Sequence, residues 1–135
     1  MKKLFSTYYS PASFNLALFL LRLGLGVLMI PHGYDKLVHF KPYSKDFINF
    51  LGMGGAVSLA LVIFAEFFCS IFLIAGLFTR AIVIPLIIDT SVALMKAHHA
   101  DVFGDGEHPT LFMIGFLAIF LVGPGRISVD GAISK

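Results

Sequence analysis

Three ionisable residues lie inside long apolar stretches of the sequence. Arg22, Glu66 and Asp89 each sit near the middle of a hydrophobic run. A charge within a bilayer costs about 2.5–3.5 kcal/mol on insertion scales, so such residues generally face the protein interior and find a partner. With both termini in the cytoplasm, a rise of about 1.5 Å per residue places all three roughly 12–18 Å from the cytoplasmic end of their spans. We therefore expect them to meet at one level.

One guanidinium and two carboxylates do not balance in charge. One carboxylate is expected to pair with Arg22 in a bidentate fork, and the other is expected to have its pKa raised by burial and by the like charge nearby. Glu66 is the candidate proton carrier. Such a group suits proton-coupled chemistry on a quinone or the passage of protons. The alternative is that the three residues only satisfy one another as polar contacts between helices.

The first apolar run carries further candidates. His32 follows Pro31, where the proline is expected to distort the helix end, and it is a candidate donor to a quinone carbonyl or a proton relay. The alternative is an interfacial histidine that caps the helix. One face of this run, at helical spacing, holds Arg22, Gly26, Met29, Gly33 and Lys36. Its glycines leave room for a neighbouring helix or a flat ligand.

A polar loop near residue 100 is rich in metal-ligand residue types. It contains His98, His99, Asp101, Asp105, Glu107 and His108. Their spacing matches no known metal motif, so we predict a solvated loop and no metal. Glu107 immediately precedes the last apolar run, where a carboxylate favours the positive end of the helix dipole. It is expected to cap that helix or to point into the mouth of the bundle.

The elements that would position these residues are membrane helices. The chain is 58% hydrophobic and 13% charged, whereas soluble domains are about 45–50% apolar and about 25% charged. We predict a single all-α domain over 1–135, an integral membrane four-helix bundle in contact with the lipid bilayer. The predicted spans are 14–34, 56–78, 81–96 and 109–122. The segment between the first two spans, 35–55, is expected to form an amphipathic helix at the membrane interface.

Charge and cysteine content exclude several classes of protein and suggest an orientation. The net charge of +2 is scattered along the chain, so no nucleic-acid partner is implied. Cys69 is the single cysteine, which excludes a dithiol centre within this chain. The first apolar run is too long for a signal peptide and contains Arg22, so it is expected to be a permanent span. Five Lys and Arg residues lie on the side of the termini against four on the other side, which favours cytoplasmic termini.

Several landmarks in order along the chain resemble the DoxX family of small four-span bacterial membrane proteins. They are Leu20–Leu23, Gly26, His32–Leu37, Glu66, Gly76–Arg80, His98, Glu107 and Gly123–Asp130. By position, the polar landmarks of the family correspond to Arg22, His32, Lys36, Glu66, His98 and Glu107. Some members of this family are parts of membrane oxidoreductase complexes, and the related DoxD proteins form the membrane subunit of a thiosulfate:quinone oxidoreductase.

The resemblance and the buried charges together suggest a membrane oxidoreductase component in the bacterial cytoplasmic (inner) membrane. We expect it to bind a quinone between the helices. A separate redox partner protein is required because the sequence has no dinucleotide-binding fingerprint, no cysteine pair and no clear haem motif. The alternative is a non-enzymatic protein, either a permease for protons or small molecules or a scaffold for soluble redox enzymes. Whether the chain forms homo-oligomers stays open.

Overall fold

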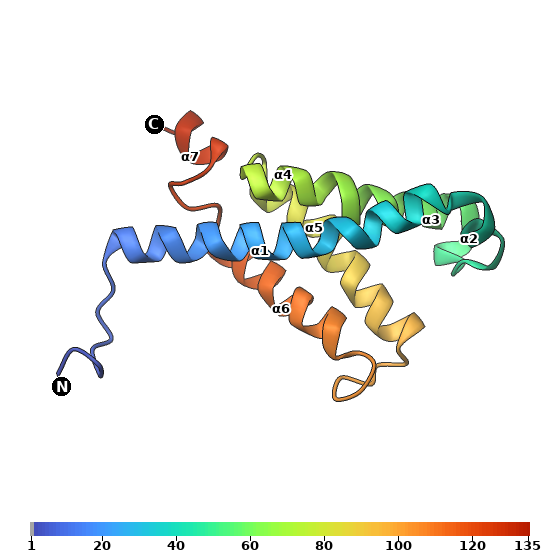
Figure 1. Cartoon of the computed structure of the whole chain (residues 1–135), viewed down its shortest axis with the longest axis horizontal. Coiled ribbons are helices and arrows are strands. Elements are labelled where there is room, and N and C mark those ends of the chain that lie inside the picture. Colours follow the sequence, from blue (N-terminus) through green and yellow to red (C-terminus); the bar gives the residue numbers. More distant parts are fainter. Residues whose placement is uncertain (1) are drawn as a thin grey trace.

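The computed structural model describes residues 2–135, and these residues form helices and turns with no strand (Figure 1). The longest element is α1 (Pro11–Val38), which begins where the Ser10 side chain accepts a hydrogen bond from the backbone N–H of Ser13. It passes through Pro31 and continues for about two more turns. The first helix is therefore longer than the predicted span 14–34, because packing against a neighbouring helix supports the turns after the proline.

The second rod consists of three joined segments. These are α3 (Gly55–Ile63), the π-helical turn η2 (Phe64–Cys69) and α4 (Ser70–Ala75). The rod ends at Gly76, which has a left-handed φ of 72°, and the N–H of Leu77 bonds the carbonyl of Phe72. This is the glycine-based C-terminal motif expected at such a position. It stops the helix before the predicted end at residue 78.

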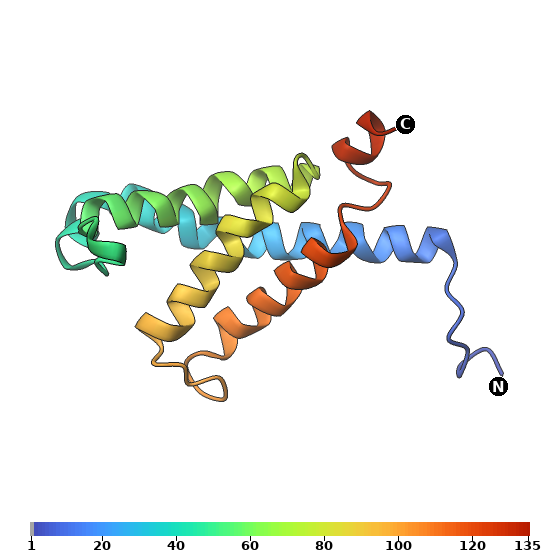
Figure 2. The ribbon, with the colours of Figure 1, turned by 180° about the vertical axis from the view of Figure 1, so that it is seen from behind.

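The third and fourth rods lie side by side and cross α1 obliquely (Figure 2). The third is α5 (Thr79–Val92), continued by the π-helical turn η3 (Ala93–Ala97). The fourth is α6 (Glu107–Val122), which ends at Gly123. The predicted spans 81–96 and 109–122 fall inside these rods, so the sequence located both helices to within two residues at each end.

The interfacial segment and the C-terminal tail are more varied than predicted. The segment 35–55 holds the short helix α2 (Phe40–Asp46) and the 3-10 turn η1 (Phe50–Gly52). The tail forms a further helix, α7 (Val129–Ile133), which sequence reasoning missed. The two ends of the chain lie toward the same end of α1 (Figure 1).

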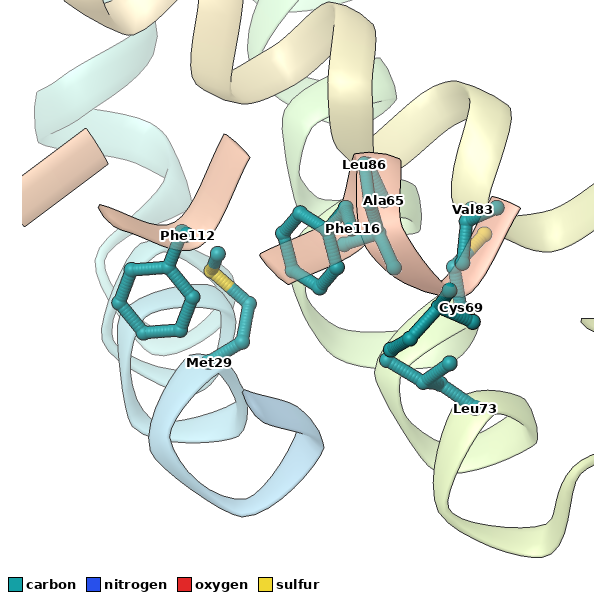
Figure 3. Packing of buried hydrophobic residues seen from close by; sticks show 9 residues of the cluster. Met29, Ala65, Cys69, Leu73, Val83, Leu86, Phe112 and Phe116 are labelled. Atoms are coloured by element: carbon teal, nitrogen blue, oxygen red, sulfur yellow. The ribbon is translucent and has the colours of Figure 1, made fainter. Parts of the chain in front are cut away.

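All four rods contribute to one apolar core (Figure 3). Its buried members are Met29, Ala65, Cys69, Leu73, Val83, Leu86, Phe112, Phe116 and Ile119. Beside this core, α1 approaches the second rod very closely at Gly33, where an added Cβ would lie 2.6 Å from the backbone nitrogen of Phe67. The glycines at 26 and 33 therefore make room for a helix, as one of the two sequence interpretations held.

Two of the rods are long and apolar enough to cross a membrane. They are α1 and the continuous rod Gly55–Ala75. α6 is also apolar but shorter. In a bilayer, the exposed apolar side chains of these helices would face lipid instead of water.

Candidate functional site

Arg22 does not meet Glu66 and Asp89, which corrects the expectation of one shared cluster. Its guanidinium donates hydrogen bonds to the carbonyl oxygens of Leu73 and Ile74, each at 3.1 Å, and to that of Ile127. The Arg22 residue is fully buried. It satisfies the last carbonyls of α4, where a cation also complements the helix dipole.

The register between α1 and the second rod explains this difference. Gly33 packs on Glu66 and Phe67, whereas Gly26 packs on Ser70 and Ile74. Arg22 precedes Gly33 by eleven positions, which is about 16 Å along a helix. Arg22 therefore lies at the far end of the second rod from Glu66.

The end of the bundle near Arg22 is closed by the C-terminal tail. The Asp130 carboxylate accepts hydrogen bonds from the backbone N–H groups of Phe78 and Thr79, both at 2.8 Å. Burial acts to raise the pKa of Asp130, but these hydrogen bonds and the charge of Arg22 outweigh it and hold the pKa below its ordinary value. The ionised carboxylate thus caps the start of α5 from a distant part of the chain.

Replacing Asp130 by asparagine is expected to lower the free energy of unfolding by about 1 kcal/mol at neutral pH, as for the loss of a helix cap. Because the pKa is depressed in the folded state, this stabilisation is present above the unfolded-state value near 3.8 and is lost as the pH falls through the folded-state pKa. The stability difference between wild type and D130N should therefore shrink below about pH 4. Unfolding in detergent micelles across this range measures it, and a difference that stays constant with pH would contradict the capping role.

The cation that lies beside Glu66 is Lys36. Its ammonium nitrogen lies 2.6 Å from Oε2 of Glu66, and the two side chains are 23% and 10% exposed. Glu66 belongs to the π-helical turn η2, a distortion that often occurs at functional sites. The close approach at Gly33 brings the two helices near enough for this ion pair to form.

Asp89 joins the pair from the third rod. Asp89 lines the same cavity as Lys36 and Glu66, and its carboxyl group is close enough to interact electrostatically with both. The cluster thus contains one cation and two carboxylates, the imbalance that the sequence suggested but with Lys36 in place of Arg22. Lys36 forms its ion pair with Glu66, and among residues 2–135 Asp89 has no ion pair of its own.

The cluster faces a cavity of about 790 Å³. Most of the wall is apolar and comes from all four rods and from the segment after α2. The polar lining residues are His32, Lys36, Ser58, Glu66, Asp89, Thr90, His98, Asp105 and His108. This size and this mixture of an apolar wall with a few convergent polar groups are typical of small-molecule sites.

An aromatic group forms one side of this cavity. The ring of His108 stacks on Phe112, with ring centres 5.3 Å apart and planes at 12°, and it meets His32 edge to face at 5.8 Å. Sequence reasoning selected His32 and His98 but missed His108 and Asp105 as cavity residues. The spacing of four between His108 and Phe112 was the available signal, since it places both on one face of a helix.

Glu107 lies outside this first cavity. It lines a second cavity of about 520 Å³, together with Leu25, Leu28, Gly104, Asp105, His108, Leu111 and Phe112. Among residues 2–135, no three histidine, cysteine or acidic side chains gather as ligands for a metal. The polar loop therefore contributes to the walls of two cavities.

These features define a small helical membrane protein with a ligand-sized cavity beside a partly buried charge cluster. Residues 17–99 match the family model named DoxX, and the chain belongs to the DoxX family. The resemblance based on the sequence landmarks is thereby confirmed. Neither the curated proteins nor the solved structures include a significant match to the chain.

Proposed function

We propose that this protein is the membrane subunit of an oxidoreductase system and binds a quinone in the first cavity. The observation that carries the proposal is the Lys36–Glu66–Asp89 cluster at the wall of an apolar cavity of about 790 Å³. A quinone has a flat apolar ring with polar oxygens, and its reduction consumes protons. The apolar wall and the protonatable cluster suit both properties.

The residues present could hold such a ligand in a defined orientation. A bound quinone would supply two-electron, two-proton redox chemistry. The Lys36 ammonium group and the His32 ring offer hydrogen-bond donors to a ring oxygen, and Phe112 offers an apolar face. In this proposal Asp89 holds a proton close to the ligand and delivers it during reduction. The negative charge left on Asp89 would then lie near the Lys36 ammonium group.

A separate partner protein supplies the electrons in this proposal. The chain has one cysteine, buried in the core, and no sequence motif for a dinucleotide or haem. The polar loop before α6 and the short helix α2 lie outside the apolar rods and are the parts available to such a partner. The protein's own contribution is therefore to bind the quinone and to manage its protons.

The second cavity favours a second candidate function, a permease for protons or a small molecule. The two cavities adjoin across a wall of Asp105, His108 and Phe112, and a movement of these side chains would join them into one path. This function predicts movement of a solute across a vesicle membrane with no dependence on quinone. A pH indicator trapped in proteoliposomes would detect proton movement of this kind.

The test of quinone binding is a titration of the purified full chain with decylubiquinone, followed by thermal shift and calorimetry. We expect saturable binding, and we expect Lys36→Gln to weaken it by roughly tenfold to a hundredfold, because a charged hydrogen-bond donor is lost. Lys41→Gln is the matched control, since Lys41 is exposed on α2 and lines neither cavity. Binding that is absent, or equal in the two variants, would contradict the proposal.

For the membrane arrangement we propose four spans, formed by the rods α1, α3–α4, α5–η3 and α6, in the bacterial cytoplasmic membrane with cytoplasmic termini. Tyr8 and Phe103 are 95% and 98% exposed and would lie on opposite sides. In a Cys69→Ala background, an impermeant maleimide added to spheroplasts should label Phe103→Cys and leave Tyr8→Cys unlabelled. The reverse pattern would invert the orientation, and labelling of both would contradict four spans.

A further inference from the structure

The two cavities are separated by a wall to which three residues contribute. Asp105, His108 and Phe112 line both the first cavity and the second. Phe112 is apolar, and Asp105 belongs to the loop that precedes α6. His108 is therefore the one imidazole, within the described part of the chain, that borders both spaces.

The position of His108 is fixed by ring contacts. Its stack on Phe112 orients the ring plane, and the edge-to-face contact with His32 places a second imidazole on the side of the first cavity. His108 is itself exposed and lies in the first turn of α6, next to the polar loop. An imidazole held in this way can accept a proton at one nitrogen and release another from the second nitrogen.

Titratable groups stand on both sides of His108. The second cavity holds Glu107, and Asp105 lies in the wall itself. The first cavity holds His32 from α1, His98 from the end of η3, and the Lys36–Glu66–Asp89 cluster from α1, η2 and α5. A protonatable ring thus stands between an acidic cavity and the buried charge cluster.

We propose that His108 is a proton-relay residue that transfers protons from the acidic second cavity to the Lys36–Glu66–Asp89 cluster. The need for a relay rests on the proposed function, because the cluster must regain each proton that it gives to a reduced ligand. The proton transfer itself does not depend on that function. His108 takes a proton at one ring nitrogen from a hydronium ion in the second cavity, which leaves water, and releases the proton of its other ring nitrogen to His32. His32 passes a proton to the Asp89 carboxylate in the same way, so each imidazole ends with the number of protons that it had at the start.

The test follows reprotonation of the cluster directly and needs neither quinone nor a partner. The full chain in nanodiscs is subjected to a rapid drop in pH, and infrared absorption monitors the protonated carboxyl band that Asp89→Asn removes. His108→Phe keeps the stack on Phe112 but cannot carry a proton. We expect this variant to slow the appearance of the band by roughly a hundredfold, within the range of general acid–base effects, with an unchanged final amplitude.

Two further variants separate proton transfer from a structural effect. His108→Ala should be equally slow, and added imidazole should restore much of its rate. His99→Asn is the matched control, because His99 belongs to the same loop but lines neither cavity, and it should react at the wild-type rate. His108→Phe at the wild-type rate, or a wild type without the Asp89 band, would overturn the proposal. Decylubiquinone binding is measured separately, so loss of binding alone would contradict the proposed function and leave the relay standing.

Discussion

Replacing Arg22 by leucine is expected to lower the free energy of unfolding by about 3–5 kcal/mol, one of the two largest effects that we predict. The guanidinium bonds three backbone carbonyls from two distant segments, and the residue is fully buried. Leucine would remove all three hydrogen bonds and with them one link between the tail and α4, although the N–H of Asp130 would still bond the carbonyl of Gly76. Reversible unfolding of the full chain in mixed micelles measures this loss.

Two variants show whether the loss comes from the contacts of this side chain. Arg22→Lys should have an intermediate effect, because one ammonium group cannot reproduce the planar set of donors. Arg126→Gln is the control, since Arg126 is exposed, and its effect should stay within about 0.5 kcal/mol. If decylubiquinone binding fell while stability was kept, Arg22 would belong to the ligand site after all.

Replacing Asp89 by asparagine should slow proton-coupled reduction of a bound quinone by roughly a hundredfold or more, with the fold and ligand binding retained. Asparagine preserves the shape of the side chain but cannot deliver a proton. The cluster would then keep only the Lys36–Glu66 pair, which is balanced in charge. Single-turnover reduction of protein-bound decylubiquinone by reduced methyl viologen, followed by stopped-flow absorbance, gives the rate.

Two further variants test whether Asp89 or Glu66 delivers the proton. Asp46→Asn is the control because Asp46 is exposed on α2 and lines neither cavity. Glu66→Gln leaves Lys36 with Asp89 as its nearest counter-ion, so it should favour loss of the Asp89 proton and shift the pH profile. A wild-type rate in D89N together with an abolished rate in E66Q would make Glu66 the proton carrier, as the sequence alone suggested.

The helices were the part of the fold that sequence reasoning could locate. Their apolar runs are long, although the cap at Ser10 and the left-handed turn at Gly76 place two of the ends three residues away from the predicted bounds 14 and 78. No sequence signal predicts the π-helical turn that carries Glu66. A π-helical turn adds one residue to a helical turn, and in a uniformly apolar run this addition does not change the hydrophobic pattern. The continuation of α1 from residue 35 to Val38 was missed because Asp35 and Lys36 interrupt the apolar run there.

The partners of the charged residues could not be obtained in the same way. Depth estimated from each helix end placed Arg22 level with Glu66, but the register is set by how Gly26 and Gly33 pack on the second rod. Lys36 was assigned to the right helix face and yet was not recognised as the counter-ion. Its long aliphatic stem lets the ammonium group reach Glu66 from the next turn.

Arg22 is synthesised before any of the backbone carbonyls that accept its hydrogen bonds. The carbonyls that receive its hydrogen bonds belong to residues 51, 52 and 105 positions later. While α1 enters the membrane, its arginine has none of these acceptors, and the insertion machinery or lipid headgroups must shelter the charge. The first helix to be made is therefore among the last to reach its final environment, and its burial is complete only when Ile127 has left the ribosome.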